Sequence, residues 1–301
     1  MINDKNLLIT GASGFIGSHL IKKYLSIGFT VHIIIRPESD IDHLSKIKSN
    51  LFIHTHDGTT ENLFDILQNI KPMLVIHLAA SFSNSIHKFQ NLDNLVESNI
   101  LFGLQLVQAM VMNDVKYFIN TGTSWQHYEH KNYSPICLYS ATKQAFKDVL
   151  QYYVEATDLR VISLKLYHTY GPDDRRNKLF CLLRNAIKNK QTLKMTPGEQ
   201  LIDIVFIDDV VDAYFKASNR LISEVGNKDE EFFVSSGNHI TLKNLVRKYY
   251  EIMKEKENII WGGNKYRFRE EMVPYNKGEI LPGWYPRINI DQGIKKMEGL
   301  I

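Results

Sequence analysis

The chain has 301 residues, which is enough for one large domain or for two closely joined ones. Hydrophobic residues make up 44% of it and charged residues 23%, as in an ordinary globular protein, so extensive disorder is not expected. The formal net charge of +3 comes without a stripe of lysine and arginine side chains, so we expect no nucleic-acid partner.

Cysteine usage and hydropathy indicate the cellular setting. The two cysteines, Cys137 and Cys181, are isolated in the sequence, which suits a reducing cytoplasm. The first residues do not form a signal-peptide pattern, and no run reaches the ~18 consecutive apolar residues that a membrane span needs. We therefore expect a cytoplasmic protein without a membrane partner.

The first part of the chain alternates short apolar runs with helical patterns. Strands are expected over residues 6–10, 30–35, 51–55, 73–77, 115–120 and 160–166. Helices are expected between them, over residues 14–27, 60–70, 91–112 and 138–156. This alternation is typical of βαβ units and a parallel sheet, and continuously apolar strands such as TVHIII indicate burial on both faces. The predicted fold class is therefore α/β, a Rossmann-type doubly wound parallel sheet.

The regular alternation weakens after Tyr170-Gly171-Pro172. Helical patterns and apolar runs still occur, at residues 178–189, 191–195, 201–207, 208–219, 231–235 and 241–254. From residue 258 onward the chain is rich in glycine, proline and aromatic residues. We expect a Rossmann domain at 1–170 and a smaller, interleaved substrate-binding domain at 171–301, whose segments around 200–240 return to the Rossmann domain.

Three glycines, Gly11, Gly14 and Gly17, follow the first strand directly in the sequence GASGFIG. Glycines let the backbone turn tightly and approach a pyrophosphate, and the N-terminus of the following helix offers free N–H groups. The alternative is a glycine-rich turn that binds nothing. The strand before the motif and the helix after it favour a bound dinucleotide.

Arg36 stands at the end of the second expected strand, where NAD-binding proteins place an acidic residue for the ribose 2′-hydroxyl. A guanidinium cannot accept a hydrogen bond from that hydroxyl, but it suits a 2′-phosphate. We therefore expect NADPH in preference to NADH. Two alternatives stay open: Arg36 as a solvated surface residue, and Glu38 as the acceptor for a 2′-hydroxyl.

Tyr139 and Lys143 are four residues apart near the start of an expected helix, so they share one face of it. A nearby ammonium group favours the phenolate, and the pair can then exchange a proton with a substrate oxygen. Thr123 lies just beyond the end of the strand over 115–120, at the sheet edge where parallel sheets bind ligands. Its hydroxyl is a candidate partner for a substrate carbonyl, and Ser124 and Thr121 are its rivals.

These motifs occur in the order seen in extended short-chain dehydrogenase/reductases: GASGFIG, His77-Leu78-Ala79-Ala80, Thr123, Tyr139-x-x-x-Lys143 and Tyr170-Gly171-Pro172. The chain resembles in particular the NAD-dependent epimerase/dehydratase group that acts on nucleotide sugars. The resemblance covers nearly the whole chain, including LIDIVFIDDVVDAY and GWYPRI. It implies that Asp57 holds the adenine and that Asn99 helps to position the active-site helix. Besides Arg36, Tyr139 and Lys143, the expected cofactor contacts are Gly11, Ser13, Gly14, Phe15, Ile16, Gly17, Asp57, Gly58, Leu78, Ala79, Ala80 and Asn99.

Departures from the family pattern reduce the number of reactions that this chain is expected to catalyse. Related dehydratases follow the catalytic threonine with Asp-Glu, whereas this chain has Ser124 and Trp125, which cannot supply that acid and base. Relatives that epimerise before reducing have a cysteine where Trp125 stands, and Cys137 is interpreted as a packing residue. The remaining reactions are simple reduction and C4 epimerisation, of which Arg36 favours reduction with NADPH.

The runs TGTSWQHY, LYHTYGPDD and PGEQLIDIVFIDDV look most like those of CDP-abequose and CDP-paratose synthases, which reduce a 4-keto group of a deoxyhexose. This resemblance implies a CDP-, dTDP- or GDP-linked substrate from the synthesis of bacterial surface polysaccharides such as lipopolysaccharide. Ile202 stands where many relatives have an arginine for the phosphates, so other cations must bind the diphosphate. The expected substrate contacts are Ser81, Ser124, Trp125, His168, Arg176, Lys178, Leu179 and Arg267.

Other features lead to weaker expectations. His54 and His56 alternate on a strand without a third ligand, so no metal site is expected. His127 and His130 are further candidates for substrate contact, because they follow Thr123 in a loop. The two long helices over 91–112 and 138–156 carry enough apolar residues for a homodimer, as in the relatives. A non-catalytic dinucleotide sensor is the remaining alternative, although Thr123, Tyr139 and Lys143 are all retained.

Overall fold

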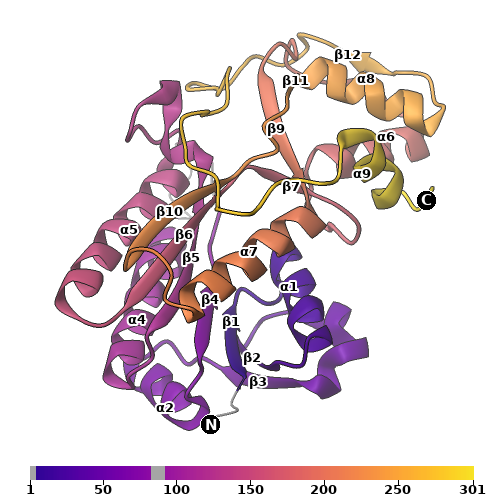
Figure 1. Cartoon of the computed structure of the whole chain (residues 1–301). Coiled ribbons are helices and arrows are strands. Elements are labelled where there is room, and N and C mark those ends of the chain that lie inside the picture. The colour runs from indigo at the N-terminus through magenta and orange to yellow at the C-terminus, as the bar shows by residue number, and fades with distance from the viewer. Residues whose placement is uncertain (1–4, 83–91) are drawn as a thin grey trace.

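A seven-stranded sheet forms the centre of the computed structural model, which describes residues 5–82 and 92–301 (Figure 1). All its neighbouring strands are parallel, in the order β10-β6-β5-β4-β1-β2-β3. The strands are β1 (Asn6–Thr10), β2 (Thr30–Ile35), β3 (Leu51–Thr55), β4 (Leu74–His77), β5 (Tyr117–Thr123), β6 (Arg160–Leu166) and β10 (Asp229–Val234). The strand order reverses at β1, where β2 and β4 lie on opposite sides of it, and such a switch point is the usual ligand site of this sheet type.

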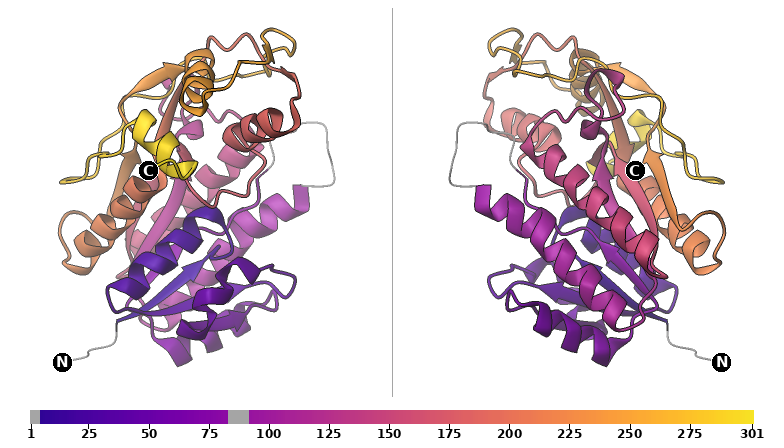
Figure 2. Two further views of the ribbon diagram at one scale, coloured as in Figure 1. Left: turned by 90° about the vertical axis from the view of Figure 1, so that its right-hand side faces the viewer. Right: turned by 90° about the vertical axis from the view of Figure 1, so that its left-hand side faces the viewer.

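Helices cover both faces of this sheet. Helices α1 (Phe15–Ser26) and α7 (Ile207–Ile222) pack together on one face. The opposite face carries α2 (Thr60–Ile70), α4 (Phe102–Met112) and α5 (Leu138–Ala156), and Figure 2 shows α4 and α5 side by side. The predicted doubly wound α/β fold is confirmed.

The two helical layers explain why the strands are apolar throughout. Side chains alternate across a strand, so neighbouring residues enter different cores. In β1, Leu7 and Ile9 join the core beneath α1 and α7, whereas Leu8 joins the core beneath α2, α4 and α5. Phe118 and Ile119 of β5 divide in the same way. A polar residue at any of these positions would therefore meet an apolar layer.

One continuous helix leads along the second face toward the site. It comprises α3 (Leu92–Val96), a π-helical turn η3 (Glu97–Leu101) and α4. The expected helix over 91–112 begins with Asn91, which lies outside the described residues. By length and composition alone, the helix Leu92–Met112 is apolar enough to cross a membrane, although no membrane span was expected. The core helices of soluble proteins pass the same test. Here it packs against α2 and α5.

The second part of the chain lies above the carboxyl ends of the strands (Figure 1). It holds a small sheet in which β9 (Leu201–Phe206) pairs with β7 (His168–Tyr170) and β11 (His239–Thr241). A strand pair joins β8 (Leu193–Lys194) and β12 (Ile259–Ile260). Its described helices include α6 (Leu179–Asn189), α8 (Leu242–Met253) and α9 (Ile290–Met297). The first part of the chain also contains the short 3-10 helices η1 (Asp42–Asn50), η4 (Ser124–Gln126) and η5 (Tyr128–His130).

Most expected elements occur within three residues of their predicted bounds, with one difference that affects the site. Strand β5 continues to Thr123 instead of ending at Asn120, because Thr123 still pairs with Leu166 of β6. The three short strands β7, β11 and β12 and helix α9 were not predicted, since they are too short to show a clear periodicity. Strand β10 and helix α7 belong to the main sheet and its cover, whereas the domain division after residue 170 stays a prediction.

Candidate active site

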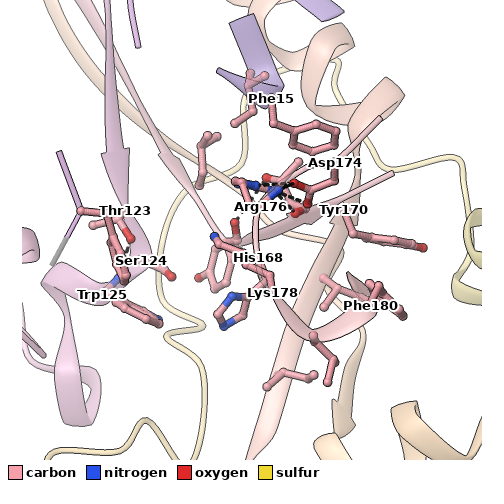
Figure 3. A pocket seen from close by; sticks show the side chains of 18 of the residues that line it. Phe15, Thr123, Ser124, Trp125, His168, Tyr170, Asp174, Arg176, Lys178 and Phe180 are labelled. Carbon is pink, nitrogen blue, oxygen red and sulfur yellow. Dashed lines mark hydrogen bonds and ion pairs between the residues drawn. The ribbon is translucent and has the colours of Figure 1, made fainter. Parts of the chain in front are cut away.

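A cavity of about 740 Å³ lies between the carboxyl ends of the central strands and the second part of the chain. This volume is within the usual range for small-molecule sites. Its wall includes the glycine-rich loop, the end of β5, the start of α5 and the segment that leads into α6. Figure 3 shows Thr123, Ser124 and Trp125 on one side and His168, Arg176 and Lys178 opposite them.

The glycine-rich loop has no room for side chains. Gly11 has a φ of +68°, and a Cβ there would lie 2.6 Å from the backbone nitrogen of Ala79. A Cβ on Gly17 would lie 2.4 Å from the carbonyl oxygen of Gly11. Gly14 precedes α1, and no side chain of the described residues caps that helix. Its first N–H groups are therefore available to an anion, so this loop fits the pyrophosphate of a dinucleotide.

A buried hydrogen bond fixes the two strands at the switch point. The Thr10 hydroxyl lies 2.8 Å from Nδ1 of His77 and accepts a hydrogen bond from the Ala79 backbone N–H at 3.3 Å. Burial lowers the pKa of His77 to about 3, so this imidazole is neutral at physiological pH. His77 therefore aligns the segment of Leu78, Ala79 and Ala80 with the glycine loop.

Asn99 connects this segment to the helix that carries the catalytic candidates. Its Oδ1 accepts a hydrogen bond from the Ser81 N–H at 2.7 Å, and its Nδ2 donates to the Ser81 carbonyl oxygen at 3.0 Å. The same Nδ2 donates to the Thr142 hydroxyl of α5 at 2.9 Å. Asn99 lies in the π-helical turn η3, where the extra residue per turn changes the direction of its side chain.

Tyr139 and Lys143 both line the cavity from the first turns of α5. Burial raises the pKa of Tyr139 to about 12, with a smaller increase from Cys137 and an opposing effect of Arg176. Burial also lowers the pKa of Lys143 to about 8. The expected lowering of the phenol pKa is therefore not found, because the cost of burying a phenolate outweighs the attraction of nearby cations. Tyr139 is a protonated acid at neutral pH.

Thr123 is held firmly at the end of β5. Its backbone N–H donates to Oε1 of Gln126 at 3.0 Å, and its hydroxyl oxygen accepts a hydrogen bond from the Trp125 N–H at 3.3 Å. Gln126 in turn donates to Gln144 of α5 at 2.6 Å. The rival Thr121 also lines the cavity, but its hydroxyl lies 2.7 Å from the Tyr214 hydroxyl of α7. Ser124 is buried and lines the cavity beside Thr123.

Aromatic rings surround the space beside Tyr139. The ring centroid of Phe82 lies 5.1 Å from that of Tyr139 and 6.0 Å from that of Trp125. Trp125 meets His168 edge to face at 5.7 Å. Burial lowers the pKa of His168 to about 4, so its imidazole is a neutral hydrogen-bonding group. A ligand group in this space would be held between flat side chains.

The cavity is lined by the three predicted diphosphate-binding cations Arg176, Lys178 and Arg267, and also by Ile202. Arg176 forms two hydrogen bonds of 2.7 Å with Asp174, and its guanidinium lies 4.5 Å from the Phe15 ring centroid. Arg267 pairs with Glu270 at 2.8 Å and lies 5.4 Å from the Trp125 ring centroid. Burial lowers the pKa of Lys178 to about 8. Leu179, which follows Lys178, lines the same wall.

Several predicted cofactor residues lie outside the cavity wall. Arg36 and Asp57 follow the ends of β2 and β3, at the same edge of the sheet as the cavity. Arg36 is largely exposed and pairs with Glu38 at 3.1 Å. The Asp57 carboxylate accepts hydrogen bonds from Thr59, which lower its pKa. The other cofactor candidates outside the wall are Ser13, Gly58, Ala79 and Asn99, and the substrate candidate Ser81 lies outside it as well.

The other residues that the sequence analysis considered for contact with substrate or metal do not line the cavity. Nε2 of His127 lies 2.6 Å from Nζ of Lys165, and its ring stacks on Tyr275, so His127 belongs to a buried charged cluster behind β5. His130 and Cys137 do not line the cavity either. His54 contacts His32 at 3.1 Å, and the described residues contain no group of three potential metal ligands.

Sequence reasoning missed several cavity residues, above all Phe82, Glu270 and Glu271. Phe82 lies far before Tyr139 in the sequence, and only tertiary packing brings the two rings together. Glu270 and Glu271 lie near the end of the chain in a segment without regular structure. Their proximity to Arg267 in the sequence was the one available signal.

Comparison with known proteins establishes the family. Residues 7–229 match the model of the NAD dependent epimerase/dehydratase family. The chain belongs to this family. The predicted membership and the prediction of an enzyme that uses a nicotinamide dinucleotide are therefore confirmed.

Relatives within the NAD-dependent epimerase/dehydratase family include two proteins named CDP-abequose synthase. The one from Salmonella typhimurium is 29% identical over 301 residues and spans 97% of this chain and 96% of the relative. The one from Yersinia pseudotuberculosis is 30% identical over 274 residues and spans 89% of this chain and 91% of the relative.

Solved structures of this family share the fold. UDP-glucose 4-epimerase from Thermotoga maritima, solved with UDP-glucose, has a TM-score of 0.84 at 23% identity and covers 97% of both chains. UDP-glucuronic acid 4-epimerase from Bacillus cereus, solved with UDP-glucuronic acid and NAD, has a TM-score of 0.83 at 21% identity and covers 98% of this chain and 100% of that one. At this identity the likeness establishes the fold alone.

Proposed function

We propose that this protein uses NADPH to reduce the 4-keto group of a deoxyhexose linked to CDP, dTDP or GDP. The observation that carries the proposal is the convergence of Thr123, Tyr139 and Lys143 at the cavity end of the glycine-rich cradle. A neutral phenol is the form that a reduction requires, because the product oxygen must receive a proton. The bacterial proteins named CDP-abequose synthase support this class of substrate.

Each side chain has a separate role in the proposed reaction. When bound, the dinucleotide supplies the hydride that goes to the carbonyl carbon. Tyr139 donates its proton to the carbonyl oxygen, and the Thr123 hydroxyl donates a hydrogen bond to the same oxygen. The Lys143 ammonium stabilises the phenolate that remains, and solvent then returns the proton. Gly11, Gly14 and Gly17 would hold the pyrophosphate against the N-terminus of α1.

The aromatic wall favours reduction over epimerisation. A C4 epimerase must present both faces of its 4-keto intermediate to the same hydride donor, so the sugar has to turn within the site. The rings of Phe82, Trp125 and His168 bound the space beside Tyr139 and oppose such a turn. Epimerisation with NAD stays the second candidate, because the similar solved structures include 4-epimerases with NAD.

The diphosphate of the substrate would bind the cations near Ile202. Arg267 and Arg176 are already oriented by Glu270 and Asp174, and each stacks on an aromatic ring, so little side-chain entropy is lost on binding. A diphosphate would also favour the charged form of Lys178.

The NADPH preference rests on Arg36. Its ion pair with Glu38 is exposed, so the guanidinium can exchange this carboxylate for a 2′-phosphate at small cost. We expect Arg36→Ala to raise the KM for NADPH about tenfold and to leave the KM for NADH unchanged, since hydrogen bonds between a guanidinium and a phosphate are charge-assisted and worth about 1.5–3 kcal/mol. A wild-type preference for NADH would instead assign the ribose contact to Glu38.

The proposed setting is a cytoplasmic homodimer that serves the synthesis of surface polysaccharides. Cys137 and Cys181 are both free, as expected in a reducing compartment. Apolar side chains of α3 and α5, including Leu92, Val96 and Tyr152, are exposed on the helical layer and would be covered by a second copy.

The decisive experiment follows the absorbance of NADPH with purified protein and a panel of CDP-, dTDP- and GDP-linked 4-keto-6-deoxyhexoses, made in situ by matching dehydratases. Stoichiometric loss of NADPH with one substrate is the expected result. Interconversion of saturated nucleotide sugars by bound NAD, without loss of NADPH, would establish the epimerase instead.

A matched variant separates catalysis from binding. Tyr139→Phe should abolish turnover and leave dinucleotide affinity unchanged, because it removes the proton donor and keeps the ring. Full activity of this variant would overturn the role of Tyr139. Dinucleotide binding without turnover of any substrate by the wild-type protein would favour the sensor.

A further inference from the structure

Glu271 is a cavity residue that the proposed reaction leaves unexplained. It lines the cavity together with Trp125 and Arg267. Its Oε1 atom is buried and has no hydrogen-bond partner among the described residues. A buried carboxyl oxygen without a donor costs about 1–3 kcal/mol, so its retention calls for a ligand or a structural partner.

The surroundings of Glu271 indicate which part of a bound ligand it would face. The Trp125 side chain and the charged groups of Glu270, Arg267 and Asp203 lie close enough to influence its carboxyl group. Trp125 in turn contacts Phe82 and His168, the rings that surround the space beside Tyr139. Glu271 therefore lies at the wall of the space where the hexose, and not the dinucleotide, would bind.

The charge state of Glu271 fits a hydrogen-bonding role. Burial is the main cause that raises the pKa of Glu271 to about 7. Trp125 and Arg267 act against this increase, whereas Glu270 and Asp203 add to it. Asp203 accepts hydrogen bonds from the Ser235 and Ser236 hydroxyls, and as a carboxylate it has no hydrogen to donate to Glu271. The terminal torsion of a glutamate is broad, so rotation brings either oxygen toward the cavity.

We propose that Glu271 is a specificity-determining residue that accepts a hydrogen bond from a hydroxyl group of the hexose of the nucleotide-sugar substrate. This inference rests on the proposed function. A hexose hydroxyl supplies the donor that the buried Oε1 atom of Glu271 lacks. A residue of this kind discriminates among sugars, because an analogue without the hydroxyl leaves the carboxyl group unpaired.

The test measures calorimetric affinities for CDP-, dTDP- and GDP-glucose and for the corresponding nucleoside diphosphates. With the nucleotide that the wild-type protein binds, we expect Glu271→Leu to weaken the affinity for the nucleotide-linked glucose about tenfold and to leave the affinity for the nucleoside diphosphate unchanged. Glu271→Gln, whose amide oxygen still accepts a hydrogen bond, should stay within about threefold of the wild type. The exposed Glu279→Gln serves as the control and should match the wild type.

Three outcomes would overturn the inference. Equal losses for the sugar nucleotide and the nucleoside diphosphate would make Glu271 a structural residue, and no loss would remove it from the site. The third outcome concerns Trp125→Phe, which lacks the indole N–H. If this variant and Glu271→Leu lost the same affinity for the nucleotide-linked glucose, and the double variant lost no more, Glu271 would act only by orienting Trp125. Retained dinucleotide binding shows that each variant is folded.

The same experiment separates this inference from the proposed function. If the wild-type protein binds none of the three nucleotide-linked sugars, the proposed function fails. If it binds one of them and Glu271→Leu binds it equally well, only the role of Glu271 fails.

Discussion

At the scale of single residues, the candidate active site contains a buried charge that destabilises the folded protein. Lys143 is 3% exposed and carries an ammonium group whose pKa is lowered by burial alone. No carboxylate among the described residues forms an ion pair with it. A buried charge without a counter-ion is destabilising, and such residues persist where function requires them.

Because burial of the Lys143 ammonium group is destabilising, we expect Lys143→Met to stabilise the folded protein and to abolish its activity. Below about pH 8 the ammonium is charged in both the folded and the unfolded chain, so the folded state bears the whole cost of burying it. Between about pH 8 and the ordinary pKa of 10.5, the folded protein releases the proton first and becomes more stable. At pH 7 the variant should therefore exceed the wild type by about 1–3 kcal/mol in the free energy of unfolding.

Urea unfolding at pH 7 and pH 10 measures this difference, which should shrink at the higher pH. Lys116→Met, on an exposed lysine, is the control and should change neither value by more than about 0.5 kcal/mol. A variant less stable than the wild type at pH 7 would show that Lys143 has stabilising contacts after all.

At the scale of elements, the junction of β1 and α1 depends on the absence of side chains. A Cβ on Gly17 would lie 2.4 Å from the Gly11 oxygen and 2.8 Å from Cα of Ala12, so Gly17→Ala must move the loop away from the helix N-terminus. We expect this variant to weaken dinucleotide binding more than tenfold, measured by fluorescence titration with NADPH.

Gly14→Ala provides the graded comparison for the same loop. Its added Cβ would lie 3.1 Å from the Gly11 oxygen, so a shift of a few tenths of an ångström accommodates it. We expect a loss of affinity smaller than that of Gly17→Ala. Equal affinities of both variants and the wild type would contradict the tight approach that the loop predicts.

The π-helical turn η3 is the second element on which the site depends. Asn99→Ala removes all three hydrogen bonds that join Ser81 to Thr142 of α5, and it leaves the Ser81 N–H without a partner. We expect a loss of about 1–3 kcal/mol in the free energy of unfolding together with a lower kcat, because α5 carries Tyr139. Thermal unfolding and steady-state kinetics measure the two effects.

The neighbouring Ser98→Ala is a matched control for that substitution. Within the part of the chain that the structure describes, the Ser98 hydroxyl donates to the exposed Asn94 and to no other group. Its loss should change neither stability nor kcat. A lower kcat for both variants would mean that any disturbance of the helix, and not the Asn99 contacts, affects the site.

At the scale of the whole molecule, the exposed apolar residues of the helical layer predict self-association. Leu101 of η3 and Tyr152 of α5 are 44% and 66% exposed. Light scattering should give twice the chain mass for the wild type and the single-chain mass for a Leu101→Lys, Tyr152→Lys double variant, because charges at a dimer interface must be desolvated. A monomeric wild type would contradict the dimer.

The sequence by itself determined the sheet, the glycine-rich loop and the pairing of Tyr139 with Lys143 on one helix face. These depend on local spacing: apolar runs that fit two buried faces, glycines where no Cβ fits, and two side chains one helical turn apart. The family resemblance read from the same motifs correctly anticipated the family.

Only the tertiary structure decided what surrounds those motifs. It showed that burial keeps Tyr139 protonated, that Thr121 is engaged by Tyr214, and that His127 faces a buried cluster away from the cavity. It also brought Glu271 from the end of the chain to Trp125. Burial and long-range contacts set these properties, and neither is encoded in the local pattern of residues.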